Sequence, residues 1–307
     1  MYDPTDPRSA LAPQAASRTV APDTPIATPT YAEFDGPPAH DDEKSGRTWA
    51  VRGQNFVLTR SVLTAGQVLD RDDPDHEHVV LLTDAGAHVA VEAAGESREI
   101  RGVAMVVVPP GASLVRACAD TEVVRLFDHR TTDVAALAVN AAEYVRPHAR
   151  VATLEPWPAP PGGDRLRVYR PDDVPAEPGR FGRIYRTRSF MVNFLDPYDG
   201  PRPRNKLSPH HHDDFQQCSL AVGGEFEHHI RTPWTPDMDQ WHPDEHRTVG
   251  SPSATIIPPP TVHTTRACGP GRNQLIDIFS PPRTDFSERD GWVLNAADYP
   301  APWEVTR

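Results

Sequence analysis

The feature that most constrains this chain is an internal repeat of short β-type segments separated by turns. The matched segments occur in the same order in both halves, and their spacing grows along the chain, which indicates small insertions in the second copy. The matched pairs are Pro109–Gly111 with Pro258–Pro260, Arg116–Cys118 with Arg266–Cys268, and Asn140–Tyr144 with Asn295–Tyr299. We therefore predict a duplicated domain.

Each copy consists of runs of four to six apolar or β-branched residues, such as Val103–Val108, between Gly, Asp and Pro clusters. This spacing is typical of an all-β sandwich or barrel, and 35 prolines against 4 methionines favour turns over long helices. The expected division is a flexible Pro/Ala-rich arm (1–45), a first barrel (46–146), a linker (147–164), a second barrel (165–283) and a tail (284–307).

The charge and apolar patterns exclude several classes of partner. A formal net charge of -12 argues against nucleic acid and against anionic membrane surfaces, and no apolar run is long enough to span a bilayer. Three scattered cysteines and the lack of a signal-peptide pattern predict a cytoplasmic location. We expect a small-molecule substrate, with a homodimer as an open alternative.

The 14 histidines of the chain concentrate between His210 and His263. In a β-strand, residues two apart point to the same face, so His210 and His212 would lie side by side. His263 follows a second Pro-rich turn on a later strand. Paired imidazoles with a third from another strand predict a metal site in the second copy. The open alternative is a solvated histidine-rich turn.

These residues give the second copy a resemblance to the cupin superfamily. The first cupin motif runs His-x-His, three or four residues, Glu or Gln, six residues, Gly, and here His210, His212, Gln217 and Gly224 match it. The second motif ends in a histidine, here His263, although proline stands at the usual glycine position. The resemblance implies an all-β fold of two tandem cupin barrels, each a double-stranded β-helix or jelly roll, with short flanking helices.

Carried over by this resemblance, the metal ligands are His210, His212, Gln217 and His263. They imply one divalent transition metal, with Fe expected first and Mn, Ni, Co or Zn as alternatives. A shorter spacing in the first motif would make Gln216 the ligand instead, and this alternative stays open. A neutral Gln in place of the commoner Glu leaves the full +2 charge on the metal.

The first copy aligns without its ligands. Alignment on the glycines places Asp72, Pro74, Val79 and Leu114 where His210, His212, Gln217 and His263 stand. His76 and His78 fall outside this register, and we interpret them as surface or edge residues. The first barrel is therefore expected to be structural, and the second to be the working half.

Beyond the ligands, the candidate catalytic residues are His229, Glu227 and Arg231. Glu227 and His229 alternate on one face of a predicted strand, and His228 takes the other face. Trp234 and Trp241 lie in an insertion that would form either a lid or a surface loop.

The function that we expect is that of a metal-dependent bicupin enzyme acting on a small organic acid or a phenolic compound. A dioxygenase is the first prediction. The alternatives are a redox-neutral isomerase, lyase or decarboxylase, and a non-catalytic cupin that binds a small molecule.

Overall fold

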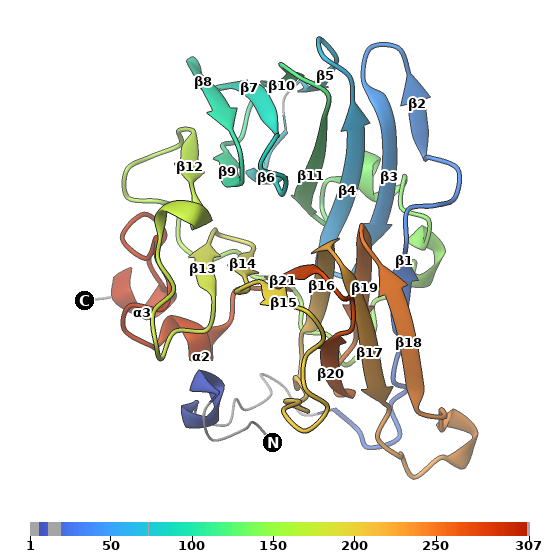
Figure 1. Cartoon of the computed structure of the whole chain (residues 1–307). Coiled ribbons are helices and arrows are strands. Elements are labelled where there is room, and N and C mark those ends of the chain that lie inside the picture. The colour runs from blue at the N-terminus through green and yellow to red at the C-terminus, as the bar shows by residue number, and fades with distance from the viewer. Residues whose placement is uncertain (1–5, 12–19, 73, 306–307) are drawn as a thin grey trace. The chain divides into compact units, whose positions relative to one another are not determined.

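The computed structural model describes residues 6–11, 20–72 and 74–305 of the 307-residue chain. The described chain is mostly antiparallel β-strand, with only short helices (Figure 1), so the predicted all-β class with short helices is confirmed. The helices are η1 (Pro7–Ala10), α1 (Thr132–Ala135), η2 (Ala141–Tyr144), η3 (Pro171–Asp173), η4 (Met238–Gln240), α2 (Thr284–Ser287) and α3 (Pro302–Val305). Within these described ranges, no helix has the length and apolar character needed to cross a membrane.

The chain divides into two compact units. We call them the N-terminal unit, made of 34–145 and 159–175, and the C-terminal unit, made of the described parts of 1–33, 146–158 and 176–307. Each unit contains one large and one small antiparallel sheet.

In the N-terminal unit, the large sheet has the order β12-β9-β6-β11-β4-β3-β2 and the small sheet the order β5-β10-β7-β8. A core of aliphatic side chains from both sheets, including Val80, Val106, Val91 and Val115, fills the interior. Alternate residues of each strand supply this core, as the period of two requires. The strands are β2 (His40–Asp42), β3 (Gly46–Arg52), β4 (Phe56–Leu63), β5 (Val68–Arg71), β6 (His78–Leu82), β7 (His88–Ala93), β8 (Glu96–Arg101), β9 (Ala104–Val108), β10 (Ser113–Ala117), β11 (Thr121–Asp128) and β12 (Arg167–Tyr169).

In the C-terminal unit, the large sheet has the order β1-β19-β16-β21-β14-β13, with β15 also paired to β21, and the small sheet has the order β18-β17-β20. Its interior is less uniformly aliphatic, because aromatic side chains such as Phe215, Phe279 and Phe286 form one cluster. The strands are β1 (Thr30–Ala32), β13 (Arg183–Arg186), β14 (Met191–Phe194), β15 (Tyr198–Asp199), β16 (Gln216–Gly223), β17 (Glu225–Arg231), β18 (Glu245–Gly250), β19 (Ser253–Ile257), β20 (Val262–Ala267) and β21 (Arg272–Ser280).

The strand order of the two large sheets is the same. The order β9-β6-β11-β4-β3 in the N-terminal unit corresponds to β19-β16-β21-β14-β13 in the C-terminal unit. In both, a short strand from elsewhere in the sequence completes the outer edge, β12 beside β9 and β1 beside β19. The repeat in the sequence is thus a repeat of topology.

These two edge strands make the structural division differ from the expected boundaries. Thr30–Ala32 was expected in a flexible arm, but it pairs with Ala254–Ile256 and belongs to the C-terminal unit. Arg167–Tyr169 was expected to begin the second barrel, but it pairs with Met105–Val107 in the N-terminal unit. A strand of three residues can form through backbone hydrogen bonds in a segment whose composition predicts disorder, so composition did not reveal these strands. Residues 1–5 and 12–19 of the expected arm lie outside the described residues.

The first part of the expected linker (147–158) and the described part of the expected tail pack within the C-terminal unit. In the linker, Trp157 is buried, and its backbone N–H donates to the Arg188 carbonyl oxygen at 2.7 Å. In the tail, Phe286 and Tyr299 are buried, and the Tyr299 carbonyl accepts from the Arg186 guanidinium. Proline-rich and polar composition signals irregular structure, but it does not distinguish a packed segment from a free one.

Candidate metal centre

Three histidines come together inside the C-terminal barrel. His210 forms an isolated antiparallel bridge with His263 on β20, with backbone N···O distances of 3.0 and 2.7 Å. His212 lies two residues further on, just before β16. The ligating atoms of His210, His212 and His263 all lie within 4.8 Å of one another, which is close enough to hold one metal ion.

Gln217 on β16 completes the group. Its Oε1 lies 2.9 Å from His212 Nε2 and 3.4 Å from His263 Nε2. Gln216 is its neighbour on the same strand, and successive side chains of a strand point to opposite faces. The structure therefore brings Gln217, and not Gln216, to the three histidines.

Backbone carbonyls orient two of the imidazoles. His210 Nδ1 lies 2.8 Å from the Ser208 carbonyl oxygen, and His263 Nδ1 lies 3.1 Å from that of Thr261. Because a carbonyl oxygen only accepts, Nδ1 of each ring carries the proton and Nε2 keeps its lone pair for a ligand role.

Two side chains beneath the site fix the amide of Gln217. Its Nε2 donates to Ser219 Oγ at 2.9 Å and to Asp277 Oδ1 at 3.0 Å, and Ser219 Oγ donates to the same Asp277 oxygen at 2.9 Å. The amide nitrogen is thus held on the carboxylate side, so the amide oxygen faces the histidines. Such a second layer of hydrogen bonds is what orients ligands in metal sites.

Burial keeps these imidazoles neutral. It lowers the pKa of His263 to about 4, and it lowers the pKa of His210 and of His212 well below the usual value. Neutral imidazoles are the form that binds a metal. Burial also raises the pKa of Asp277, against the lowering effect of its hydrogen bond from Ser219. The donor set of three nitrogens and one amide oxygen fits a first-row divalent ion.

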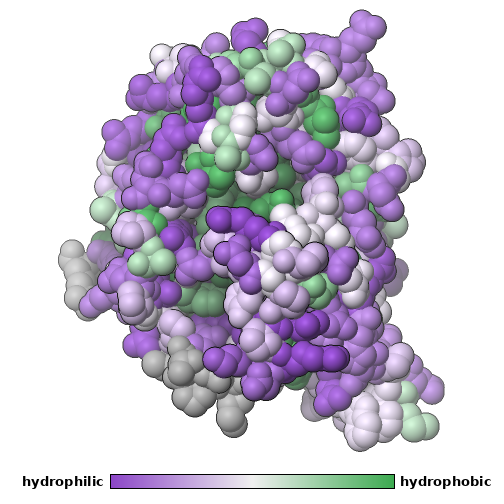
Figure 2. Space-filling view, in the orientation of Figure 1, coloured by the Kyte–Doolittle hydropathy of each residue, from purple (hydrophilic) through white to green (hydrophobic). Residues whose placement is uncertain are grey.

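A pocket of about 550 Å³ opens onto this site. His210, Gln217, His263 and Asp277 form part of its wall. Trp234 and Trp241 are not among the described residues that line it. They stack on each other at 4.6 Å in the loop between β17 and β18, which projects at the lower right of Figure 1 and carries pale and green residues in Figure 2. The pair therefore belongs to a surface loop and does not cover this pocket.

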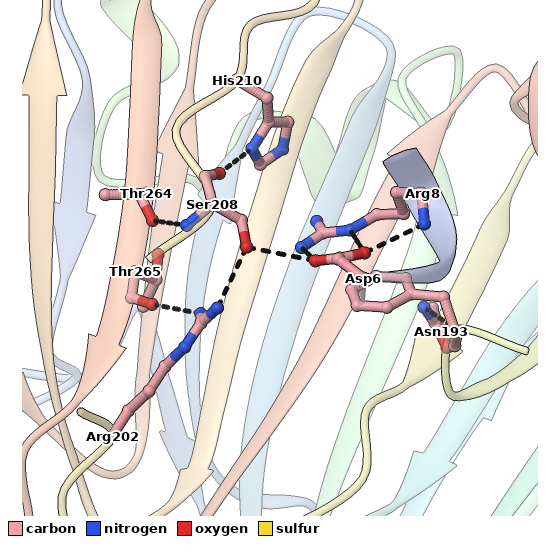
Figure 3. Close-up of polar contacts among 9 residues, drawn as sticks. Asp6, Arg8, Asn193, Arg202, Ser208, His210, Thr264 and Thr265 are labelled. Atoms are coloured by element: carbon pink, nitrogen blue, oxygen red, sulfur yellow. Dashed lines mark hydrogen bonds and ion pairs between the residues drawn. The ribbon is translucent and has the colours of Figure 1, made fainter. Parts of the chain in front are cut away.

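The N-terminal segment contributes a residue that the sequence did not indicate. Arg8 of η1 is buried and lines the pocket. Its Nη2 pairs with Asp6 Oδ2 at 2.8 Å, and this oxygen accepts from Ser208 Oγ at 3.1 Å (Figure 3). Ser208 in turn holds His210 through its carbonyl oxygen. The available signal was Asp6 before Pro7, a helix-start pattern, within a segment whose composition predicted an arm.

A second arginine reaches the same hydroxyl group. Arg202 Nη2 donates to Ser208 Oγ at 3.0 Å, and Arg202 also lines the pocket (Figure 3). Two guanidinium groups from distant parts of the sequence thus stand beside one wall of the metal site, which makes this side of the pocket suited to a carboxylate.

The three catalytic candidates, His229, Glu227 and Arg231, were expected to line the barrel, but they lie on the outer face of β17. Glu227 and His229 contact Arg266 and His246 on the outer side, and Arg231 is exposed and paired with Asp244. His228, between them, is the buried residue. Phe226 and Ile230 share its face and are buried too, so apolar neighbours at a spacing of two were the signal for the inner face.

His228 has an unused hydrogen-bonding atom inside the barrel. Its Nδ1 lies 2.9 Å from Thr265 Oγ1, whereas its buried Nε2 has no partner among the described residues. Burial is the largest cause that lowers the pKa of His228 to about 3, so the ring is neutral at neutral pH.

The sequence alignment of the first copy was one residue out of register. His78 pairs with Val108 across β6 and β9, as Gln217 pairs with Ile257 across β16 and β19. His78, and not Val79, therefore corresponds to Gln217. It is buried and stacked on Phe127 at 5.1 Å, so its interpretation as a surface or edge residue was wrong.

The other ligand positions shift in the same way. Arg71 pairs with Ser113 in the N-terminal unit, as His210 bridges His263 in the C-terminal unit. Ser113, and not Leu114, thus corresponds to His263, and Arg71, not Asp72, to His210. The same register moves the His212 position from Pro74 to Asp73, which lies outside the described residues.

A test of the amide orientation is the substitution Asp277→Asn. The Asn side chain can offer N–H groups where the carboxylate accepted, so Gln217 would no longer be fixed with its oxygen toward the histidines. We expect the affinity for a divalent metal to fall by about 10- to 100-fold, as for other residues that orient metal ligands. Competition with a chromogenic chelator measures it. Asp70→Asn, an exposed carboxylate of the other unit, is the control, and an unchanged affinity in Asp277→Asn would contradict this orientation.

Comparison with known proteins finds the fold but no close relative. No protein-family model matches the chain, and no curated protein matches its sequence. Oxalate decarboxylase of Lactobacillus farciminis, solved as a formate complex, is similar in structure with a TM-score of 0.56 and 14% identity, covering 87% of this chain and 88% of that one.

Two further solved structures show the same architecture. An IolB-like protein from Salmonella typhimurium gives a TM-score of 0.50 at 13% identity, covering 79% of this chain and 91% of that one. Procruciferin, an 11S globulin of Brassica napus, gives 0.53 at 9% identity, covering 83% and 84%. Together with the two topologically matched barrels, these likenesses confirm the predicted tandem cupin fold. At such identities they bear on the fold alone.

Proposed function

We propose that the C-terminal barrel is the active site of a metal-dependent enzyme that acts on a small organic acid by redox-neutral, lyase-type chemistry. His210, His212, Gln217 and His263 would hold one divalent transition metal. The observation that carries the proposal is the Gln217 amide, whose oxygen is directed at the three imidazoles by Asp277 and Ser219.

The neutrality of this donor set supports the reaction class. A divalent ion held by three imidazoles and an amide would supply a Lewis acid with its full +2 charge, which favours an anionic substrate. Arg202, and Arg8 in its ion pair with Asp6, present guanidinium donors at the pocket wall where such a substrate would enter. The fold is also that of an oxalate decarboxylase, which is consistent with a small carboxylate but does not select it.

Residues deeper in the barrel would orient the substrate. His228 Nε2 and Thr255 Oγ1 are buried and have no hydrogen-bond partner among the described residues. Thr255 pairs with Ser219 across β19 and β16, which places it on the same inward face as Gln217. Buried polar atoms of this kind are normally satisfied, so a polar substrate is their expected partner.

The expected dioxygenase and the non-catalytic cupin remain the competing candidates. Three histidines can also hold Fe(II), the metal that the expected dioxygenase would use. The experiment is to purify the protein with its native metal, measure metal content, and follow a panel of small carboxylates by NMR with and without oxygen. Turnover at the same rate without oxygen supports the proposal. Oxygen-dependent turnover identifies a dioxygenase, and absence of stoichiometric metal overturns the enzyme proposal altogether.

The substitution Arg8→Ala tests the role of the N-terminal segment. We expect KM for a carboxylate substrate to rise by about 10-fold or more, because a charge-assisted hydrogen bond contributes about 1.5–3 kcal/mol, while metal content stays at the wild-type value. Arg8→Lys keeps the charge and is expected to restore part of the affinity. A kcat effect with unchanged KM would show that Arg8 acts through the position of Ser208 and His210 instead.

A further inference from the structure

The N-terminal barrel carries hydrogen-bond donors at the positions that surround the metal centre in the C-terminal barrel. Arg71 and Ser113 stand at the positions of His210 and His263, and His78 stands at that of Gln217. Arg125 on β11 is a fourth match, at the position of Asp277 on β21. Arg125 pairs with Val80 in the N-terminal unit, as Asp277 pairs with Ser219 in the C-terminal unit. A purely structural barrel could carry aliphatic side chains at these four positions, but this barrel carries polar ones.

Arg125 is buried without a partner for its charge. The residue is 8% exposed, and its guanidinium makes no hydrogen bond to any described residue, with the buried Nε among the unsatisfied atoms. Its carbon Cζ lies 5.1 Å from the centre of the Phe127 ring. That contact uses the face of the guanidinium, whereas its five N–H groups point outward in the plane and need acceptors.

The carboxylates of Asp70 and Asp133 favour the charged form of Arg125 from a distance, but neither forms a hydrogen bond or ion pair with it. Arg71 forms a two-pronged ion pair with Asp133 and keeps a buried Nε without a partner. Asp70 is paired with Lys44. Among the described residues, one arginine charge thus lacks a counter-charge in direct contact. An isolated buried charge is strongly unfavourable, whereas an anion in hydrogen-bonding contact would compensate it.

The state of His78 agrees with a positive interior. Burial, together with the charges of Arg125 and Arg71, lowers its pKa to about 3. The ring is therefore neutral at neutral pH, and its buried Nδ1 also lacks a partner among the described residues.

We propose that the N-terminal barrel binds a small carboxylate anion, held by the guanidinium fork of Arg125 with Arg71, Ser113 and His78 as further donors. A planar carboxylate matches the fork of an arginine with two parallel hydrogen bonds. A pocket of about 500 Å³ is lined by Arg71 and Ser113 but not by Arg125 or His78, so it would be the route by which the anion enters. The same pocket is lined by Asp72, Glu92 and Glu96, and this negative rim favours a singly charged anion over phosphate.

The experiment is calorimetric titration of the full-length protein with sodium acetate, with sodium chloride at equal ionic strength as the blank. The titration uses the His263→Ala variant, so that acetate binding to a metal in the C-terminal barrel does not contribute to the measured heat. We expect saturable acetate binding, with a Kd in the millimolar range or tighter. Arg125→Gln should weaken it at least about 10-fold, whereas Arg47→Gln, an exposed arginine of the same unit, should not change it.

Thermal unfolding separates binding from a structural role. Acetate should raise the Tm of the parent and of Arg47→Gln, but not that of Arg125→Gln. If Arg125→Gln does not fold, Ser113→Ala replaces it, with a several-fold weaker acetate Kd expected. No saturable acetate binding, or equal binding in the variants, would overturn the proposal. Binding of inorganic phosphate without binding of acetate would overturn the assigned ligand class.

Discussion

Replacing His263 with alanine is expected to empty the metal centre and abolish turnover. His263 supplies one of the three imidazoles, whose ligating atoms all lie within 4.8 Å of one another. Loss of a direct ligand should cost more than the 10- to 100-fold in affinity that loss of an orienting residue costs. We therefore expect metal content to fall from about one equivalent to a small fraction of it, measured by mass spectrometry after dialysis.

Chelator treatment gives a second measure of the same change. Metal present at about 1,000 times its Kd stabilises the folded protein by about 4 kcal/mol, so removing it should lower the unfolding temperature of the wild type but not that of His263→Ala. The matched control is His229→Ala, because His229 lies on the outer face of β17 and pairs with His246. Equal metal content in His263→Ala and the control would rule out the proposed ligand set.

Replacing Phe286 with alanine should give the largest loss of stability that we predict. Phe286 is fully buried, its ring centre lies 5.2 Å from that of Trp292 and 6.1 Å from that of Phe279, and the Arg283 guanidinium lies 3.7 Å above it. Such a truncation removes apolar contacts and leaves a cavity, which costs about 3–5 kcal/mol. Denaturant unfolding followed by tryptophan fluorescence measures it.

The control for this change is Val305→Ala, an exposed apolar residue in the same C-terminal segment. It should stay within about 0.5 kcal/mol of the wild type. A loss of less than about 1 kcal/mol in Phe286→Ala would show that the segment after β21 is only loosely attached.

The sequence could predict the strands and the group of possible ligands because both depend on local spacing. His210, His212 and Gln217 lie within eight positions, and His263 follows a recognisable turn. It could not predict the edge strands, because three-residue backbone pairing leaves no side-chain pattern. Phe226 and Ile230 predict the buried face of β17. The catalytic candidates were instead chosen from the polar residues of the opposite face.

The register error in the first copy has a similar cause. Glycines mark turns, and turn lengths differ between the two copies, so aligning them moved a whole strand by one residue. Because a one-residue shift exchanges the two faces of a strand, His78 was assigned to the outside although Val80 and Leu82 share its face in the core. The buried arginines were missed for the same reason.

The two edge strands also set an order for biosynthesis. The sheet of the N-terminal unit is completed only when β12 has left the ribosome, well after the last strand of its own repeat, and β1 must wait for β19, more than two hundred residues later. Until then, β9 would present an unpaired edge and β1 would lack its partner strand, and an unpaired edge is the kind of surface on which strands of other chains add. A cut of the gene between the repeats would leave β9 and β19 with permanently open edges, so each half made alone is expected to aggregate.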